Sequence, residues 1–326
     1  MNPAPTVNAI TAALATTSLG SINRSQNLPK PKPPTIVFPL LSLALIFIFL
    51  LLVRREVAIK CISIPSSQPP PICNVINPLL EITLHQLVAS HRDVTSVLAT
   101  DTRTVAPGSQ QYVFLVLELT GDGDLCSAVY EEEEMLLPVY LREGPASSSP
   151  GPSAEEAASW DLKPENILLF SEPDASSSSK FASKSEFRFI PKLADFGLAS
   201  EEVRSEHFRI GTRAYASPEC YGDPRTDYAP FDHCASDVWS LGMILYNMIS
   251  ALHPWPYTDG YPSNSNFRAF LSDSWTFKPR GVTKEMYTVV LGALKHDVRR
   301  RCTLGELREQ VRAVERVFEE GERWLS

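Results

Sequence analysis

Two short motifs constrain this 326-residue chain more than any other feature. Asp161-Leu-Lys-Pro-Glu-Asn166 is followed by Asp195-Phe-Gly197. The first motif offers a carboxylate that can orient a hydroxyl, a lysine that can bind a phosphate, and an amide oxygen for a metal. The second adds another carboxylate. Phosphoryl transfer needs these groups, because its catalysis is mostly positioning and charge neutralisation. The pair therefore predicts a fold that holds both segments at one phosphate site.

The composition excludes several other classes of protein. The net charge of −8 argues against a nucleic-acid-binding protein, which normally carries a basic patch. The six cysteines are scattered and form no C-x-x-C pair, which is typical neither of a zinc site nor of a disulfide framework. They are expected to be reduced thiols in a cytosolic domain. A hydrophobic content of 44% is sufficient for a sizeable core.

The first part of the chain differs from the rest. Residues 1–35 are rich in small and polar residues and proline, and are predicted to be disordered. Residues 36–53 carry no charge and are just long enough for a membrane-spanning helix, with Arg54-Arg55 directly after them. If they span a membrane, the two motifs lie on the cytosolic side and the N-terminus outside, because the nucleotides that donate phosphoryl groups are cytosolic. Alternatively, residues 36–53 form a helix that packs on the following domain, or they are a translated non-coding stretch. In either case the protein would be soluble and cytoplasmic or nuclear.

Apolar patterning beyond residue 54 predicts both strands and helices. Strands are expected at 56–63 and 112–117, and helices at 79–89, 238–252, 284–294 and 303–324. Two further apolar segments, 167–170 and 189–194, lie on either side of a Ser-rich stretch. Thr303 is the expected N-cap of the last helix, with Glu306 completing a capping box. Two low-complexity stretches, 126–158 and a Ser-rich insert at 171–186, are expected to be loops.

From about Glu56 to Phe318, the order of the motifs resembles eukaryotic serine/threonine protein kinases. The two opening motifs are preceded by Val57-Ala-Ile-Lys60 and followed by Gly211-Thr-Arg-Ala-Tyr-Ala-Ser-Pro-Glu219 and Asp237-Val-Trp-Ser-Leu-Gly242. The resemblance implies an α+β, two-lobed protein-kinase-like fold. Residues 54–119 would form a truncated, β-rich small lobe, and residues 120–320 a mostly helical large lobe.

The resemblance also assigns a role to each catalytic residue. Asp161 would accept or orient the proton of the substrate hydroxyl, and Lys163 would neutralise the transferring phosphoryl group. Lys163 also marks the serine/threonine branch of the family. Asn166 and Asp195 would bind Mg2+, a hard cation that prefers oxygen ligands. The implied cofactors are ATP and Mg2+.

The resemblance implies a second set of residues around the nucleotide. Lys60 would bind the α- and β-phosphates and pair with Glu81. The adenine and ribose would be bound by residues of the third strand, the hinge and the large lobe, namely Ala58, Leu117, Glu118, Thr120, Asp124 and Leu168.

The implied partner is a protein substrate with no nucleic acid. Glu165 matches a residue that, in some members, meets an arginine upstream of the target, which indicates a basic sequence around the acceptor Ser or Thr. Gly211 and Thr212 begin the substrate-docking loop, in which Thr212 would bridge Asp161 and Lys163. Three further residues are expected to support the fold: Glu219 and Arg301 as a buried salt bridge, and Asp237 beneath the catalytic loop.

Three departures from the kinase pattern favour an alternative function. No G-x-G-x-x-G loop precedes Lys60, Ser159-Trp160 stand where the family has His-Arg, and residues 126–160 replace a long amphipathic helix. The alternative is a catalytically impaired pseudokinase or scaffold. Since whole blocks are replaced while their flanks stay intact, we also consider mis-joined or unspliced coding segments. A transcript that matched this chain throughout codons 1–60 and 125–162 would contradict that explanation.

A narrower resemblance is to fungal serine/threonine kinases of the meiosis-repressing type. It is carried by the substrate loop up to Cys220, by Phe267-Arg-Ala-Phe-Leu271 and by Leu304-Gly-Glu-Leu-Arg-Glu-Gln-Val-Arg-Ala-Val314.

Overall fold

The computed structural model describes residues 56–64, 78–104, 111–131, 161–173, 187–200, 202, 204–206, 208, 211–221, 230–255 and 264–320. The expected disordered segment 1–35 and the apolar run 36–53 lie outside these residues, so the membrane hypothesis stays a prediction. Within the described residues, no helix combines the length and apolarity that a membrane crossing needs. The chain divides into two units, Met1–Asn74 with Ser96–Leu119, and Val75–Thr95 with Thr120–Ser326.

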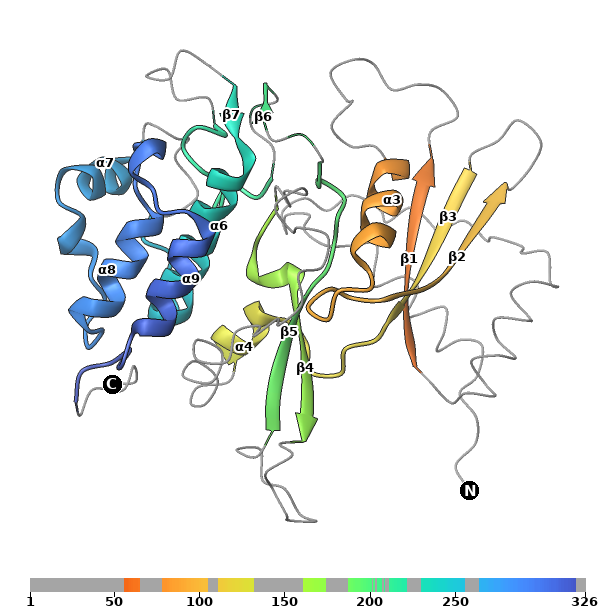
Figure 1. Ribbon diagram of the computed structural model, residues 1–326, viewed down its shortest axis with the longest axis horizontal. Coiled ribbons are helices and arrows are strands. Elements are labelled where there is room, and N and C mark those ends of the chain that lie inside the picture. Colours follow the sequence, from red (N-terminus) through yellow and green to blue (C-terminus); the bar gives the residue numbers. More distant parts are fainter. Residues whose placement is uncertain are drawn as a thin grey trace, which may run out of the picture. The chain divides into compact units, whose positions relative to one another are not determined.

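The first unit contains an antiparallel three-stranded sheet (Figure 1) of β1 (Val57–Ile64), β2 (Val97–Thr104) and β3 (Gln111–Glu118), in the order β1-β3-β2. β3 is the central strand, which its continuous apolar sequence favours because both of its faces can be buried. β1 alternates, with Ile62 buried and Cys61 exposed. The sequence patterning did not predict β2, since most of its residues are polar.

The second unit begins with α3 (Pro78–Val88), and its β-structure includes a hairpin of β4 (Ile167–Pro173) and β5 (Phe187–Leu193). β4 continues to Pro173, so residues 171–173 of the expected Ser-rich insert belong to a strand, and 174–186 lie outside the described residues. The prediction of a loop at 126–158 is also wrong at its start, because α4 spans Leu125–Glu131.

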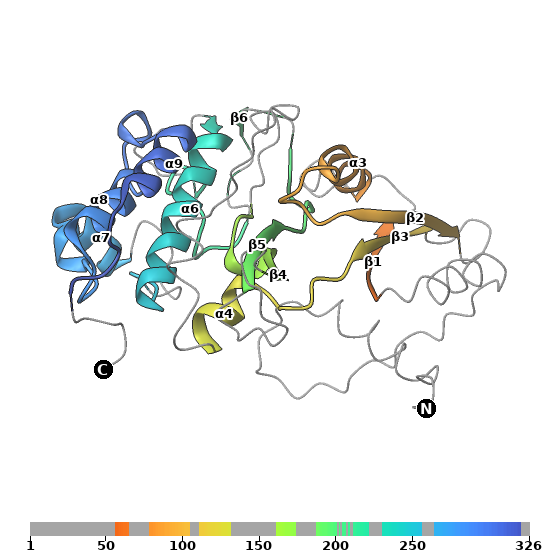
Figure 2. The same ribbon diagram turned by 60° about the horizontal axis from the view of Figure 1, so that its bottom comes forward.

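Four helices follow: α6 (His233–Ser250), α7 (Ser265–Ser272), α8 (Lys284–Ala293) and α9 (Leu304–Ala313). Figures 1 and 2 show α6, α8 and α9 side by side. The remaining short elements are β6 (Arg204–Ser205), β7 (Phe231–Asp232), and the 3-10 turns η3 (Pro164–Asn166), η6 (Ser274–Phe277) and η7 (Val298–Arg300).

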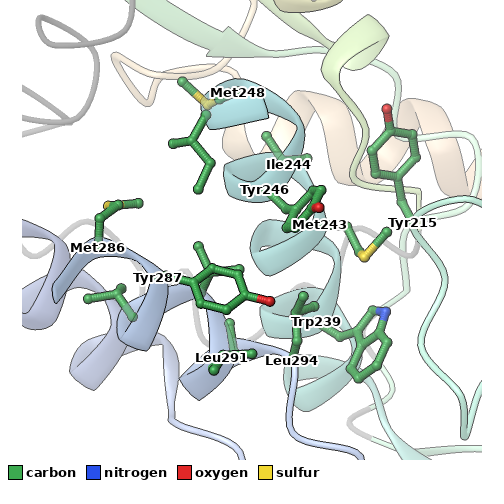
Figure 3. Packing of buried hydrophobic residues seen from close by; sticks show 14 of the residues in the cluster. Tyr215, Trp239, Met243, Ile244, Tyr246, Met248, Met286, Tyr287, Leu291 and Leu294 are labelled. Atoms are coloured by element: carbon green, nitrogen blue, oxygen red, sulfur yellow. The ribbon is translucent and has the colours of Figure 1, made fainter. Parts of the chain in front are cut away.

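The largest hydrophobic core of the described residues surrounds α6. Trp239 and Met243 of α6 are almost completely buried, as are Met286 and Tyr287 of α8. Figure 3 shows the side chains of these two helices facing one another. The apolar run near 238–252 is therefore the central helix of the core, and it begins earlier than predicted because Asp232 caps it by accepting from the Ala235 amide.

The capping box at the start of α9 is confirmed, with Thr303 and Glu306 bonding each other's backbone. The prediction that this helix extends to residue 324 is wrong, because α9 ends at Ala313. Beyond it, the Val317 carbonyl accepts from the Thr283 amide, and Phe318 pairs with Val282. The residues after α9 therefore pair with the segment before α8 and pack against the apolar core, instead of continuing the helix.

Candidate catalytic site

The β4–β5 hairpin brings the two opening motifs together. Ile167 directly follows the first motif and lies opposite Leu193, which is two residues before Asp195. The Ala194 amide donates to the Asn166 carbonyl at 2.8 Å. Since facing residues of antiparallel strands are only about 5 Å apart at Cα, the hairpin register places Asn166 and Asp195 at the same end of the hairpin.

The Asp161 carboxylate is held on both of its oxygens. Oδ1 accepts from the Thr212 amide at 2.8 Å and from the Thr212 hydroxyl at 2.7 Å. Oδ2 accepts from Lys163 Nζ at 2.6 Å, and Lys163 also donates to Thr212 Oγ1 at 3.1 Å. The Asp161 side chain is only 13% exposed. Three charge-assisted bonds therefore hold the carboxylate in a single orientation.

Asn166 is buried, and its side-chain amide N–H donates to the Asp161 carbonyl at 3.0 Å. This bond uses the nitrogen of the amide and leaves its oxygen as the atom suited to a cation. Asp195 has an exposed side chain and a left-handed backbone, with φ of 62°. A non-glycine residue with positive φ is uncommon and marks a position that the surrounding structure enforces.

These oxygen donors fit Mg2+. Among the described residues, no group of three His, Cys, Asp or Glu side chains could by itself hold a metal ion. Mg2+ is usually bound by one or two protein oxygens together with substrate phosphates and water. Asn166 and Asp195 would hold the ion in this way, and the bound ion would neutralise phosphate charge.

The substrate loop begins with a glycine that its backbone requires, since Gly211 has φ of 82°. The following turn closes with a bond from the Tyr215 amide to the Thr212 carbonyl at 2.9 Å. Ser240 of α6 donates to the Tyr215 carbonyl, also at 2.9 Å. The loop that binds Asp161 is thus fastened to the central core helix.

The substrate loop ends at a buried ion pair. Glu219 receives two bonds from the Arg301 guanidinium, at 2.5 and 3.0 Å. Arg301 also donates to the Ala235 and Lys295 carbonyls, and its guanidinium lies over the Trp239 ring. The Arg301 guanidinium is thus paired with a carboxylate and hydrogen-bonded to two further carbonyl groups. A charge can be buried when it is paired and hydrogen-bonded in this way.

Residues 156–311 match the protein kinase domain family. Serine/threonine-protein kinase ksp1 of Schizosaccharomyces pombe is 26% identical over 269 residues, covering 79% of this chain and 50% of that protein. The negative regulator of sexual conjugation and meiosis of the same yeast is 25% identical over 258 residues, covering 70% and 48%.

Residues 156–311 therefore belong to the protein kinase domain family, and the curated proteins that the chain resembles are serine/threonine kinases. The resemblance read from the motifs is thereby confirmed, including the likeness to fungal kinases that regulate meiosis. Serine/threonine-protein kinase chk-2 of Caenorhabditis elegans is 30% identical over 184 residues, covering 52% of this chain and 33% of that protein. The chain thus spans about half the length of the first two curated relatives, and less of the third.

The residues predicted to bind the nucleotide fall in both units of the kinase. In the first unit, Ala58 lies opposite Leu117 and Lys60 opposite Leu115 in the sheet register, so these side chains share one face. The Glu118 amide donates to the Ser96 carbonyl at 3.1 Å. The predicted residues of the second unit are Glu81, Thr120, Asp124 and Leu168. The pairing of Lys60 with Glu81 stays a prediction.

In the second unit, Asp124 forms a β-bridge with Leu168, and its carboxylate accepts from the Ser127 amide at 2.8 Å, at the start of α4. Glu165 is exposed on η3, next to the buried Asn166. Asp237 lies on α6. Ser159-Trp160 lie outside the described residues.

The sequence carried no indication of one residue that supports the substrate loop, His253. His253 Nε2 contacts the Tyr215 hydroxyl at 3.4 Å, with the rings edge to face at 5.3 Å. Burial lowers the pKa of His253 below its ordinary value. A lone histidine after an apolar helix carries no signal of such a contact, because the contact joins positions far apart in the sequence.

Proposed function

We propose that this chain transfers the γ-phosphoryl group of Mg-ATP to a serine or threonine hydroxyl of a protein. The observation that carries the proposal is the Asp161–Lys163–Thr212 cluster, in which each carboxylate oxygen of Asp161 is hydrogen-bonded. A carboxylate held in one orientation can position an attacking hydroxyl, which is the task that phosphoryl transfer assigns to the protein.

The neighbouring residues have complementary roles in this proposal. Lys163 stabilises the charge on the transferring group, and Asn166 and Asp195 hold Mg2+ beside it. Lys60, Ala58, Leu117 and the other predicted nucleotide-binding residues hold ATP. The exposed carboxylate of Glu165 favours a substrate with a basic residue near the target hydroxyl. Residues 54–119 and 120–320 are proposed as the small and large lobes.

A pseudokinase is the second candidate, and two sequence observations favour it. The chain has no Gly-rich loop before Lys60, so the backbone amides that would cover the phosphates are missing from the sequence. Trp160 also removes the arginine that would bind an activation-segment phosphate. Such a protein would bind a nucleotide or a partner without phosphoryl transfer.

Purified full-length chain distinguishes the two functions. Radiolabelled phosphate from ATP should appear on a basic Ser/Thr peptide in the presence of Mg2+, and Asp161→Asn should reduce the rate by at least about 100-fold. Asp122→Asn, on an exposed turn, is the matched control. A Mg2+-dependent thermal shift with ATP but no transfer would favour the pseudokinase. A folded chain that shows neither ATP binding nor phosphate transfer would overturn the kinase activity, and a nucleotide-binding pseudokinase as well.

A further inference from the structure

Two exposed apolar side chains of the second unit are tied to one buried amide. Tyr130, near the end of α4, is 48% exposed, and Leu252, just after α6, is 64% exposed. Asn247 of α6 is completely buried, and its side-chain N–H groups donate to the Tyr130 hydroxyl at 2.8 Å and to the Leu252 carbonyl at 3.4 Å. A polar side chain in an apolar core helix is costly unless it is hydrogen-bonded. The asparagine therefore holds α4 and the turn after α6 together.

The turn that carries Leu252 is fixed in an uncommon conformation. Ala251 has a left-handed backbone, with φ of 52°. The Leu252 amide donates to the Ser250 hydroxyl oxygen at 3.2 Å, and that hydroxyl donates to the Tyr246 carbonyl at 2.7 Å. Strained backbone of this kind persists only where the surrounding structure enforces it, and it is common at ligand-binding positions. A single exposed leucine needs no explanation, but this one is held outward by a rigid turn.

The same turn contacts the substrate loop. His253 directly follows Leu252, and its Nε2 lies 3.4 Å from the Tyr215 hydroxyl, with the two rings edge to face at 5.3 Å. The Tyr215 amide in turn bonds the carbonyl of Thr212, whose hydroxyl donates to Asp161. Leu252 is therefore connected to the catalytic carboxylate through a short series of contacts.

The charges near these two side chains are negative. Four consecutive glutamates, Glu131–Glu134, follow Tyr130 in the sequence. On its other side, α4 packs beside η3, which carries the exposed Glu165. Carboxylates at these positions favour a positively charged partner and oppose binding to an anionic lipid surface.

We propose that Tyr130 and Leu252, here called the apolar pair, form a docking surface for one apolar side chain of the substrate polypeptide, close in sequence to the acceptor serine or threonine. The inference rests on the proposed function, since the occupant is the substrate of that reaction. Two observations favour this occupant: the contact of the turn with the substrate loop, and the carboxylates that suit a basic peptide. Because both side chains are already fixed, little conformational entropy is lost when a peptide covers them.

The test uses the full-length chain and a set of basic Ser peptides with an alanine background. The peptides differ only in the position of a single leucine, which is moved through both flanks of the acceptor. We expect leucine at one position, or at two neighbouring positions, to raise kcat/KM about tenfold through a lower KM, because a leucine side chain is partly removed from water. Phosphorylation with no leucine preference at any position would overturn the proposal.

Variants of the apolar pair separate docking from a merely structural role. Leu252→Asp should abolish the preference for leucine at that peptide position and replace it by a preference for lysine, because a carboxylate attracts the ammonium group. Tyr130→Ala, which removes the ring, should reduce the leucine preference to about threefold or less. Leu304→Ala on α9 is the matched control, since Leu304 is 55% exposed, and it should keep the wild-type preference. A full leucine preference in Leu252→Asp or Tyr130→Ala would overturn the proposal.

Peptide binding measured by fluorescence anisotropy distinguishes failure of the docking surface from failure of the proposed function. A chain that transfers no phosphate, but binds the leucine peptide about tenfold more tightly than the alanine peptide and loses this difference in Leu252→Asp, would retain the docking surface and refute the catalysis. Equal binding of the two peptides would overturn the docking surface. Light scattering covers the remaining occupant: a dimer that Leu252→Asp dissociates would assign the apolar pair to a second copy of the chain, and would also overturn the proposal.

Discussion

Arg301 shows how a single buried side chain can join distant parts of the second unit. Its guanidinium is 1% exposed and bonds Glu219, at the end of the substrate loop. It also bonds the Ala235 carbonyl in α6 and the Lys295 carbonyl after α8. Removing one member of a buried ion pair leaves the other charge without compensation, which is strongly destabilising.

We therefore expect Glu219→Ala to lower the free energy of unfolding by about 3–5 kcal/mol. Urea denaturation followed by tryptophan fluorescence measures the change. Arg299→Ala is the control, since Arg299 is 90% exposed and an ion pair at the surface, such as the one it forms with Asp297, contributes little to stability. Similar midpoints for the two variants would show that the buried pair contributes little.

His253 links stability to pH. Burial lowers its pKa from an ordinary value of 6.5. As the pH falls below 6.5, the unfolded chain therefore binds this proton before the folded chain does. The stability associated with the neutral ring is complete above that pH and is lost as the pH falls toward the folded-state pKa. Protonation would also remove Nε2 as an acceptor for the Tyr215 hydroxyl.

The corresponding test compares wild type with His253→Gln, which cannot titrate. Between about pH 7.5 and pH 5, the wild type should lose more unfolding free energy than the variant. Denaturant titrations at each pH give the two curves, and their difference isolates His253 from the other histidines. Parallel curves would contradict the assignment.

Among the elements, the β6–β7 pair shows how the segment before the substrate loop is held. Arg204 lies opposite Asp232 and Ser205 opposite Phe231, with Ser205 only 2% exposed. Phe231 stacks on His233 at 5.1 Å. Backbone pairing and ring packing hold these residues in the described structure.

A negative charge at Ser205 should therefore disrupt the pairing. We expect Ser205→Asp to lower the unfolding free energy by about 2 kcal/mol or more, because the carboxylate would be buried. Exchange at 204–206 should also become faster. Glu206→Asp, at an exposed neighbouring position, is the control. Slower exchange in Ser205→Asp would indicate instead that a charge here stabilises the segment.

Across the larger unit, stability depends on how closely its helices approach one another. A Cβ added to Gly242 of α6 would lie 2.7 Å from Ala293 Cβ and 2.9 Å from Leu294 Cδ2. Neither neighbour is the end of a long flexible chain. The α6–α8 contact at the centre of the core thus requires glycine for its small size.

Gly242→Ala should cost about 1–3 kcal/mol through overpacking. Gly305→Ala is the control, because no atom lies within 4 Å of a Cβ added there. At this helical position, the substitution should raise the free energy of unfolding by about 0.4–1 kcal/mol, so the two variants should change stability in opposite directions. Thermal denaturation of both variants gives the comparison. A stabilising Gly242→Ala would show that α6 and α8 can separate without loss of packing.

Periodicity and capping signals predicted most of the regular elements. The apolar run of β3 and the helical spacing of α3 and α8 were sufficient, and Thr303 with Glu306 correctly marked the start of α9. The same reasoning missed β2, whose side chains are mostly polar. It also extended α9 too far, because the pairing of Phe318 with Val282 depends on a distant segment.

The catalytic residues were proposed from the motifs alone, since each motif is short and carries its chemistry in the residue types themselves. Nothing local in the sequence could show that His253 meets Tyr215 or that His85 packs on Phe196. Those contacts join residues 38 and 111 positions apart. They arise only when the hairpin, α3 and α6 pack together, because hydrogen bonds and ring contacts depend on distance in space rather than on spacing along the chain.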